Sequence, residues 1–177
     1  MRVVAGELGG RRLTAPRGRA TRPTAARTRE ALFSILGDIA GARVLDLFAG
    51  SGALGIEALS RGAANATFVD SQQSAIDAIV ANRAALDLER RSVVLRADVR
   101  ENRWAVSGAS YDLVFADPPY ASDFGALLGR LLPPVLAPGA RVVTESDRRA
   151  PLDLTLPLRI ERRYGDTLIR IHQARET

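Results

Sequence analysis

Residues 44–60 constrain the fold of this 177-residue chain more than any other stretch. An apolar strand, 44–48, runs into a glycine-rich loop with the pattern G-x-G-x-x-G, and the loop opens a helix. Asp70 ends the next apolar run, twenty residues beyond the first glycine of the loop. This spacing is typical of the first strand, loop and helix of a nucleotide-binding α/β sheet. The three glycines are Gly50, Gly52 and Gly55.

Apolar strands and amphipathic helices alternate along the chain from residue 42 onward. Strands are expected at 44–48, 66–69, 93–95, 113–116 and 141–144, and helices at 54–60, 73–86 and 124–136. Two further strands, 158–164 and 167–172, flank Gly165-Asp166, a dipeptide typical of hairpin turns. The pattern predicts an α/β fold with a mainly parallel seven-stranded sheet and a C-terminal antiparallel hairpin.

Positive charge is concentrated at the N-terminus. Residues 1–30 contain eight Arg and two acids, a net charge of +6, whereas the rest contains 17 Arg and 18 acids, a net charge of −1. A localised basic segment is typical of a polyanion binder, and the alternative is a solvated tail. We predict a basic N-terminal extension, 1–22, that forms a small hairpin around residues 6–10, followed by the main domain, 23–177, whose first helix opens at Thr24 and stops at Gly37.

The absence of some residue types excludes several kinds of chemistry. The chain has no cysteine, which excludes disulfides, a cysteine nucleophile and carbon-5 methylation of a pyrimidine through a thiol adduct. His172 is the only histidine, so a His-based triad or a multi-histidine metal site is not expected; we place it at the surface or at a sheet edge. Because no membrane span or secretory signal is visible, we expect a cytoplasmic location.

Carboxylates follow or end three of the expected strands. Asp46, just ahead of the glycine loop, would repel the pyrophosphate of NAD but suits S-adenosylmethionine, which carries an ammonium and a sulfonium and no phosphate. Asp70 would accept hydrogen bonds from ribose hydroxyls, and Asp98 could take the exocyclic amine of the adenine. Each acid could instead cap a helix, and this alternative is strongest for Asp98.

The sequence Asp117-Pro118-Pro119-Tyr120 follows the strand at 113–116. Proline fixes φ and donates no N–H, so the Asp117 carboxylate and the Pro118 carbonyl can be two rigid acceptors beside the flat ring of Tyr120. Such a corner fits an exocyclic NH₂ group on a planar base. Accepting both hydrogens restores lone-pair density on the nitrogen, which can then attack the sulfonium methyl in line. The alternative is that the prolines end the strand and Asp117 caps the next helix.

The chain resembles class I S-adenosylmethionine-dependent methyltransferases, and specifically the RsmD family of bacterial 16S rRNA guanine-N2 methyltransferases. The resemblance rests on the N-terminal elements "GRRL", "RPT" and "REALF", on "LDLFAGSGALGIEALSRGA" and on "YDLVFADPPY". It implies a Rossmann-like methyltransferase domain over 23–177. It also implies a guanine in 16S rRNA as substrate, within the assembled small subunit, and we infer no obligate protein partner and no membrane association.

The resemblance also implies a set of site residues. The donor would contact Asp46, Phe48, Gly50, Gly52, Asp70, Asp98 and Val99, and the region of Arg22 and Thr24 would close over its methionine end. The target amine and base would contact Asp117, Pro118 and Tyr120. The basic N-terminus, independently of the resemblance, could hold phosphates of the RNA through Arg2, Arg11, Arg12, Arg17, Arg19 and Arg22. No metal is expected.

Three other functions stay open at this point. Adenine also carries an NH₂ group, so residues 117–120 fit an adenine-N6 methyltransferase acting on DNA or RNA, although the N-terminal elements favour guanine. A non-catalytic RNA-binding assembly factor could keep the same fold, but the intact loop and acids argue against it. An NAD-dependent oxidoreductase is the weakest alternative, because Asp46 disfavours the dinucleotide.

Overall fold

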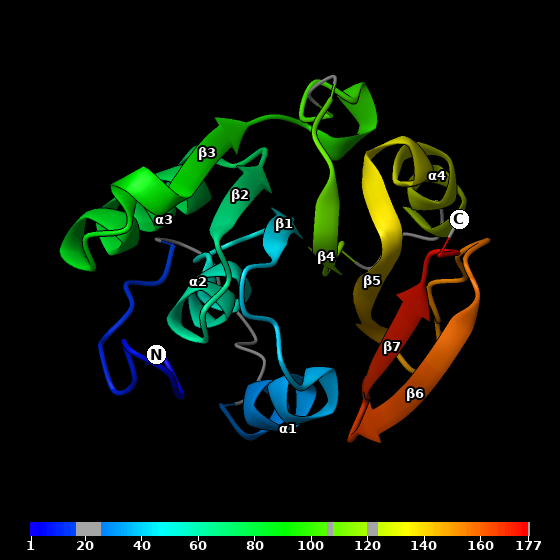
Figure 1. Ribbon diagram of the computed structural model, residues 1–177, viewed down its shortest axis with the longest axis horizontal. Helices are drawn as coiled ribbons and strands as arrows, with labels where there is room; N and C mark the ends of the chain where they lie inside the picture. The colour runs from blue at the N-terminus through cyan, green and yellow to red at the C-terminus, as the bar shows by residue number, and fades with distance from the viewer. Residues whose placement is uncertain (17–25, 106–107, 120–123, 177) are drawn as a thin grey trace.

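The computed structural model describes residues 1–16, 26–105, 108–119 and 124–176 (Figure 1). Within them, one seven-stranded sheet has the order β3-β2-β1-β4-β5-β7-β6. The strands are β1 (Arg43–Leu47), β2 (Asn65–Asp70), β3 (Ser92–Arg96), β4 (Tyr111–Ala116), β5 (Leu136–Asp147), β6 (Leu158–Tyr164) and β7 (Thr167–Gln173). The first five are parallel, and β7 is antiparallel to both β5 and β6. The predicted fold class, including the C-terminal hairpin, is confirmed.

The helices connect these strands and differ from the prediction in one place. They are α1 (Ala26–Leu36), α2 (Ala53–Ser60), α3 (Gln73–Ala85) and α4 (Phe124–Leu131), with the 3₁₀ turns η1 (Glu89–Arg91), η2 (Val99–Glu101) and η3 (Pro133–Val135). The helix predicted over 124–136 ends early, because the two prolines of η3 have no N–H to continue it. β5 is correspondingly longer than the predicted strand at 141–144, with an irregular ladder over 137–140. Among the described residues, no helix has the length and apolar character to cross a membrane.

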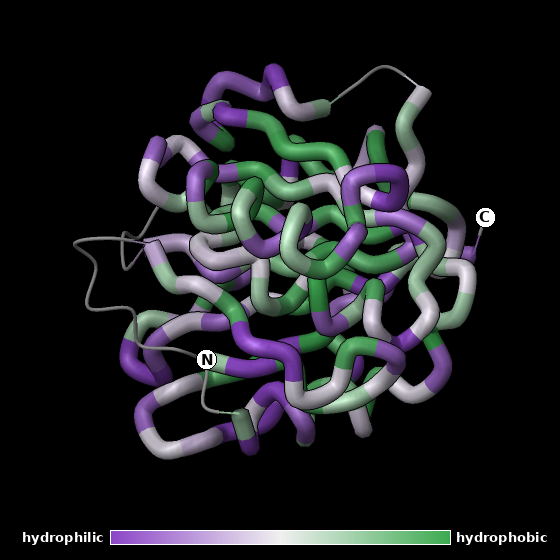
Figure 2. The backbone as a smooth tube through the Cα atoms, turned by 90° about the vertical axis from the view of Figure 1, so that its left-hand side faces the viewer, coloured by the Kyte–Doolittle hydropathy of each residue, from purple (hydrophilic) through white to green (hydrophobic). Residues whose placement is uncertain are grey.

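Both faces of the central strands β1 and β4 are buried, because alternate residues point to opposite sides and helices cover both sides. In β1, Val44 belongs to a core cluster shared with α1, α2 and α3, whereas Leu45 belongs to a second cluster shared with α4. Trp104 completes this second cluster and donates its indole N–H to the carbonyl of Val99 at 2.9 Å. Figure 2 shows the apolar segments inside and the polar ones outside. The result is a three-layer arrangement that leaves the ends of the parallel strands accessible.

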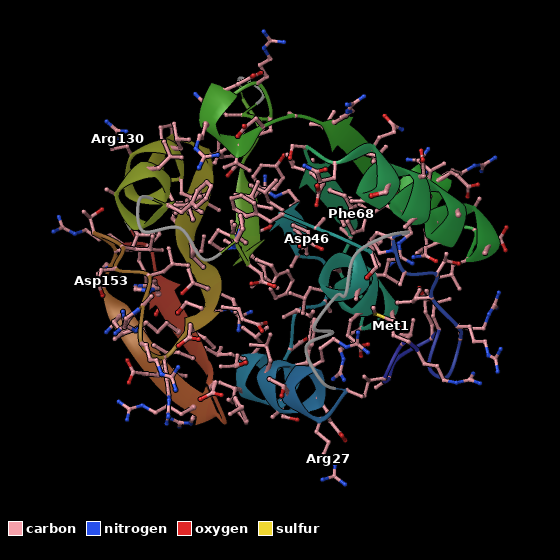
Figure 3. The ribbon with its side chains drawn as sticks, turned by 180° about the vertical axis from the view of Figure 1, so that it is seen from behind. Met1, Arg27, Asp46, Phe68, Arg130 and Asp153 are labelled. Carbon is pink, nitrogen blue, oxygen red and sulfur yellow. The ribbon has the colours of Figure 1, made fainter. Side chains whose placement is uncertain are left out.

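The N-terminal segment packs along α2 rather than projecting into solvent. An antiparallel bridge joins Arg2 and Arg12, so the hairpin predicted around residues 6–10 is present as a minimal pairing. The buried carboxylate of Glu57 accepts hydrogen bonds from the backbone N–H groups of Val4 at 2.7 Å and Ala5 at 3.0 Å. Figure 3 accordingly shows the start of the chain beside α2. The predicted domain boundary at residue 22 lies outside the described residues and stays a prediction.

His172 is not at the surface, contrary to the expectation from sequence. It lies on β7, which is an inner strand between β5 and β6, and it is 2% exposed. Its Nδ1 lies 3.0 Å from the carbonyl oxygen of Leu156, and burial lowers the pKa of the imidazole. The expectation was wrong because the final strand in sequence inserts between two others and is not an edge strand.

We predict that Glu57→Ala destabilises the protein by about 3 kcal/mol, because it leaves two backbone donors and Arg61 without their buried carboxylate. The Arg61 Nε lies 2.8 Å from Glu57 Oε1. Urea unfolding measures the loss, and Glu30→Ala, an exposed acid on α1, serves as the control and should change stability by less than about 0.5 kcal/mol. Equal effects of the two substitutions would show that the N-terminal segment is not held by Glu57.

Candidate active site

A pocket lies at the edge of the sheet where β2, β3 and β4 end. Parallel strands place their carboxyl ends on one side, which is where ligands bind open α/β sheets. The sequence-predicted residues Phe48, Asp70 and Asp98 all line this pocket, together with Val99. The complete lining is Phe48, Asp70, Ser71, Gln72, Ala97, Asp98, Val99, Arg100, Pro119 and Phe124.

The glycine loop depends on the missing side chains at two positions. Gly52 has φ of 76°, a left-handed conformation that other residues adopt at a cost, and it precedes α2 directly. At Gly55, a Cβ atom would lie 2.4 Å from the ring of Phe68 and 3.1 Å from Asp46 Oδ2. Figure 3 shows Asp46 and Phe68 close together beside α2. The glycines therefore turn the chain and let α2 pack directly on β2 and β1.

Asp70 shapes this loop and also belongs to the pocket wall. Its Oδ2 accepts a hydrogen bond from the N–H of Gly50 at 2.9 Å, and its Oδ1 accepts from the N–H of Gln72 at 2.9 Å. Each carboxylate oxygen has a second lone pair, so both can still accept from a ligand hydroxyl. The side chain is 5% exposed and is fixed in direction by its two backbone donors. This geometry suits the predicted role of holding a ribose.

Asp46 lies beneath the loop and is not among the described residues that line the pocket. Its Oδ2 accepts a hydrogen bond from the N–H of Gly55 at 2.9 Å. Burial raises the pKa of Asp46 from 3.8 to about 8; the bond from Gly55 opposes this shift, and the nearby carboxylates of Asp70 and Asp117 add to it. Asp46 thus anchors α2 to β1, and its predicted contact with the donor stays a prediction.

Asp98 and Phe48 fix two further parts of the wall. Asp98 accepts a hydrogen bond from the N–H of Arg100 at 2.9 Å, so it caps η2, which was the alternative considered from sequence. It nevertheless lines the pocket with a side chain that is 42% exposed. Phe48 has φ of 58°, and its ring packs edge-on against Phe124 with centroids 4.9 Å apart. This left-handed conformation of a bulky residue concentrates strain at the pocket.

The sequence Asp117-Pro118-Pro119-Tyr120, called the acceptor motif below, begins where β4 ends, at the same edge as the glycine loop. Asp117 is exposed and Pro118 is buried, whereas Pro119 is the motif residue that lines the pocket. Asp117 is close enough to Asp46 to raise its pKa. Tyr120 lies outside the described residues. The contacts predicted for Asp117 and Pro118 with a target amine therefore stay predictions.

The arginines predicted to bind RNA are only partly described. Arg2 donates to the carbonyl of Gly10 at 2.6 Å, and Arg11 donates to the carbonyl of Ala85 at 2.8 Å. Ala85 ends α3, which returns from the pocket edge to the start of β3, so Arg11 is held at the opposite end of the sheet. Arg12 is exposed. The other residues predicted at the donor or RNA, Arg17, Arg19, Arg22 and Thr24, lie outside the described residues.

Sequence reasoning missed the role of Asn82 next to the glycine loop. This buried residue of α3 accepts from the N–H of Thr14 at 2.7 Å and donates to the carbonyls of Thr14 and Ser51, each at 2.9 Å. It therefore joins the N-terminal segment to the loop residue between Gly50 and Gly52. The signal was an amide among apolar residues of a helix, but nothing local indicated its partners.

We predict that Asp46→Asn changes how stability depends on pH. Because the folded-state pKa of Asp46 is raised from 3.8 to about 8, its contribution is largest below about pH 4 and is lost as pH rises toward 8. Asn keeps an oxygen for the Gly55 N–H but does not titrate. The unfolding free energy of the wild type minus that of the variant should fall by about 1.4 kcal/mol per pH unit between pH 5 and 7.5 in urea titrations. A difference that stays constant over this range would mean that Asp46 is ionised in the folded protein.

Comparison with known proteins agrees with this architecture. A family model described as "Conserved hypothetical protein 95" matches residues 1–173. The putative rRNA methyltransferase YlbH of Bacillus subtilis is 37% identical over 183 residues, covering 99% of this chain and 100% of that protein. Ribosomal RNA small subunit methyltransferase D of Escherichia coli K12 is 40% identical over 121 residues, which span 68% of this chain and 60% of that protein.

Solved structures of similar proteins superpose on this chain over nearly its full length. The putative methyltransferase yhhF from Escherichia coli superposes with a TM-score of 0.86 at 32% identity, covering 100% of this chain and 99% of that one. A hypothetical protein of Thermus thermophilus, TTHA0928, superposes with a TM-score of 0.81 at 32% identity, covering 98% and 99% of the two chains. The chain therefore belongs to the family described as conserved hypothetical protein 95, the family of RsmD-type methyltransferases.

Proposed function

We propose that this protein transfers a methyl group from S-adenosylmethionine to the exocyclic N2 of a guanine in 16S rRNA, within the small ribosomal subunit in the cytoplasm. One observation carries the proposal. A single pocket combines Asp70 and Asp98, which suit the ribose and adenine of the donor, with Pro119 of the acceptor motif. This supports a donor site and an acceptor site at the same edge of the sheet.

The residues of the pocket fit this donor. Asp70 presents free lone pairs beside the glycine loop, where two ribose hydroxyls can donate to them. Asp98 is partly exposed and can accept from an amine, while the buried side chain of Val99 offers an apolar surface to the adenine ring. The donor supplies a methyl group made electrophilic by its sulfonium. In the described residues no cluster of three or more His, Cys, Asp or Glu side chains could hold a metal.

The acceptor corner would activate the target nitrogen by position and charge. An aromatic amine is a weak nucleophile because its lone pair is delocalised into the ring. Asp117 and the carbonyl of Pro118, both at the end of β4, would accept its two hydrogens and turn the lone pair toward the methyl carbon. As the new N–C bond would form, the bonding electrons of the methyl–sulfur bond would stay on sulfur, and the nitrogen would then pass one proton to water.

Guanine in rRNA is favoured over the other substrates considered. Two of the relatives named above are described as a putative rRNA methyltransferase and a small-subunit rRNA methyltransferase, which supports RNA over DNA. The N-terminal elements that resemble the family favour guanine over adenine. A non-catalytic assembly factor would have no need of the pocket wall, whose acids are held in place by backbone donors.

We predict that the protein methylates unmethylated small subunits at a guanine. Incubation with tritiated S-adenosylmethionine, followed by nuclease digestion and chromatography, should place the label in N2-methylguanosine. Free 16S rRNA should be labelled more slowly if the assembled surface is recognised. Label found only in N6-methyladenosine would reject guanine as the target, and RNA without label would reject the proposed methyltransferase activity.

We predict that Asp117→Ala lowers kcat by about 100-fold while the dissociation constant for the donor changes less than about twofold. The carboxylate is assigned to the target amine, so its loss should spare the donor. Asp112→Ala is a matched control, because Asp112 lies on the same strand but pairs with Arg43 at 2.9 Å at the opposite end. Single-turnover kinetics and calorimetry measure the two quantities. An Asp117→Ala enzyme with the turnover of the control would remove Asp117 from the mechanism.

A further inference from the structure

Arg100 belongs to the pocket but was not among the residues predicted from sequence. It lies in η2, directly after the adenine-side residues Asp98 and Val99. It lines the same pocket as Pro119 of the acceptor motif, and it is the one arginine in that lining among the described residues. Arg100 therefore shares one pocket with residues expected at the donor and with Pro119 of the acceptor motif.

The guanidinium is held in place by stacking. Its central carbon lies 4.3 Å above the centroid of the Phe124 ring. That ring is 2% exposed and is itself held edge-on by Phe48, so the platform is rigid. A cation–π contact uses the face of the aromatic ring and does not consume the hydrogen-bond donors of the guanidinium. Arg100 is thus oriented without using its hydrogen-bond donors.

The charge of Arg100 is only weakly neutralised. Its ion pair with Asp98 spans 3.9 Å from Nη1 to Oδ2, beyond hydrogen-bond range, and its side chain is 57% exposed. Arg2 and Arg11 keep their charge too, but each commits a donor to a backbone carbonyl of the chain itself. Arg11 also lies at the far end of the sheet. A guanidinium with available donors at the pocket is therefore better placed to meet an anion near the target nucleotide.

Of the two substrates, the RNA supplies that anion. The adenine and ribose of the donor, which would lie at Asp70 and Asp98, are uncharged, and its sulfonium is positive. Its one carboxylate belongs to the methionine end, which the resemblance assigns to the region of Arg22 and Thr24. The RNA brings one phosphate per nucleotide, and a guanidinium binds phosphate through paired N–H donors. We propose that Arg100 binds a backbone phosphate beside the target nucleotide and so positions the base at the acceptor corner. This inference rests on the proposed function, but it does not depend on which base accepts the methyl group.

The test compares Arg100→Ala with Arg130→Ala, which removes the same charge from α4, where the side chain points away from the rest of the molecule (Figure 3). Binding to unmethylated small subunits is measured by filter retention from about 50 to 200 mM salt. Arg100→Ala should weaken binding about tenfold and reduce the slope of log affinity against log salt by about 0.7 to 0.9. Arg130→Ala should change affinity less than twofold. Arg100→Lys should recover part of the affinity, because it keeps the charge but not the paired donors.

Donor binding, measured by calorimetry with S-adenosylhomocysteine, separates the alternatives. It should be unchanged in Arg100→Ala. Loss of donor affinity with RNA affinity intact, or the same RNA affinity and salt slope as Arg130→Ala, would overturn the proposal. The methylation assay on the wild type tests the proposed function separately. The ratio of variant to wild-type RNA affinity does not depend on which base is methylated.

Discussion

Two buried aspartate side chains determine the shape of the site. Asp46 binds the N–H of Gly55 and so ties the start of α2 to β1, while Asp70 binds the N–H of Gly50 and ties the loop to β2. Without these bonds the loop would have backbone donors inside the protein with no partner. Because β4 lies next to β1 in the sheet, fixing the loop also fixes its relation to the acceptor motif at the end of β4.

The parallel strands and the C-terminal hairpin could be predicted because their signals are local, whereas the position of β7 between β5 and β6 was not predicted. The alternation of apolar runs with helical spacing indicated the parallel strands, and the dipeptide Gly165-Asp166 indicated the hairpin between β6 and β7. From parallel strands it follows that Asp70 and Asp98 meet at one edge, as they do. The helix end at Leu131 was missed, although the two prolines that cause it are visible in the sequence.

The contacts that could not be predicted join residues far apart in the chain. Glu57 reaches the N–H of Val4 across 53 residues, and Asn82 reaches Thr14 across 68. For the same reason, net charge was an incomplete guide to the arginines that could bind RNA. It indicated Arg2 and Arg11, which donate to the chain's own carbonyls. It did not indicate Arg100, whose position depends on packing against Phe124. The sequence shows where the arginines are, whereas the fold decides which of them can contact a ligand.

The central claim is that the donor wall and the acceptor corner lie together at one edge of the sheet. The most direct measurement is a crystal structure of the protein with S-adenosylhomocysteine. We expect its ribose hydroxyls on the carboxylate of Asp70, its adenine beside Val99, and its sulfur facing the corner formed by Asp117 and Pro118, with space between them for a flat base. A ligand whose sulfur points away from that corner, or whose ribose lies far from Asp70, would contradict the account.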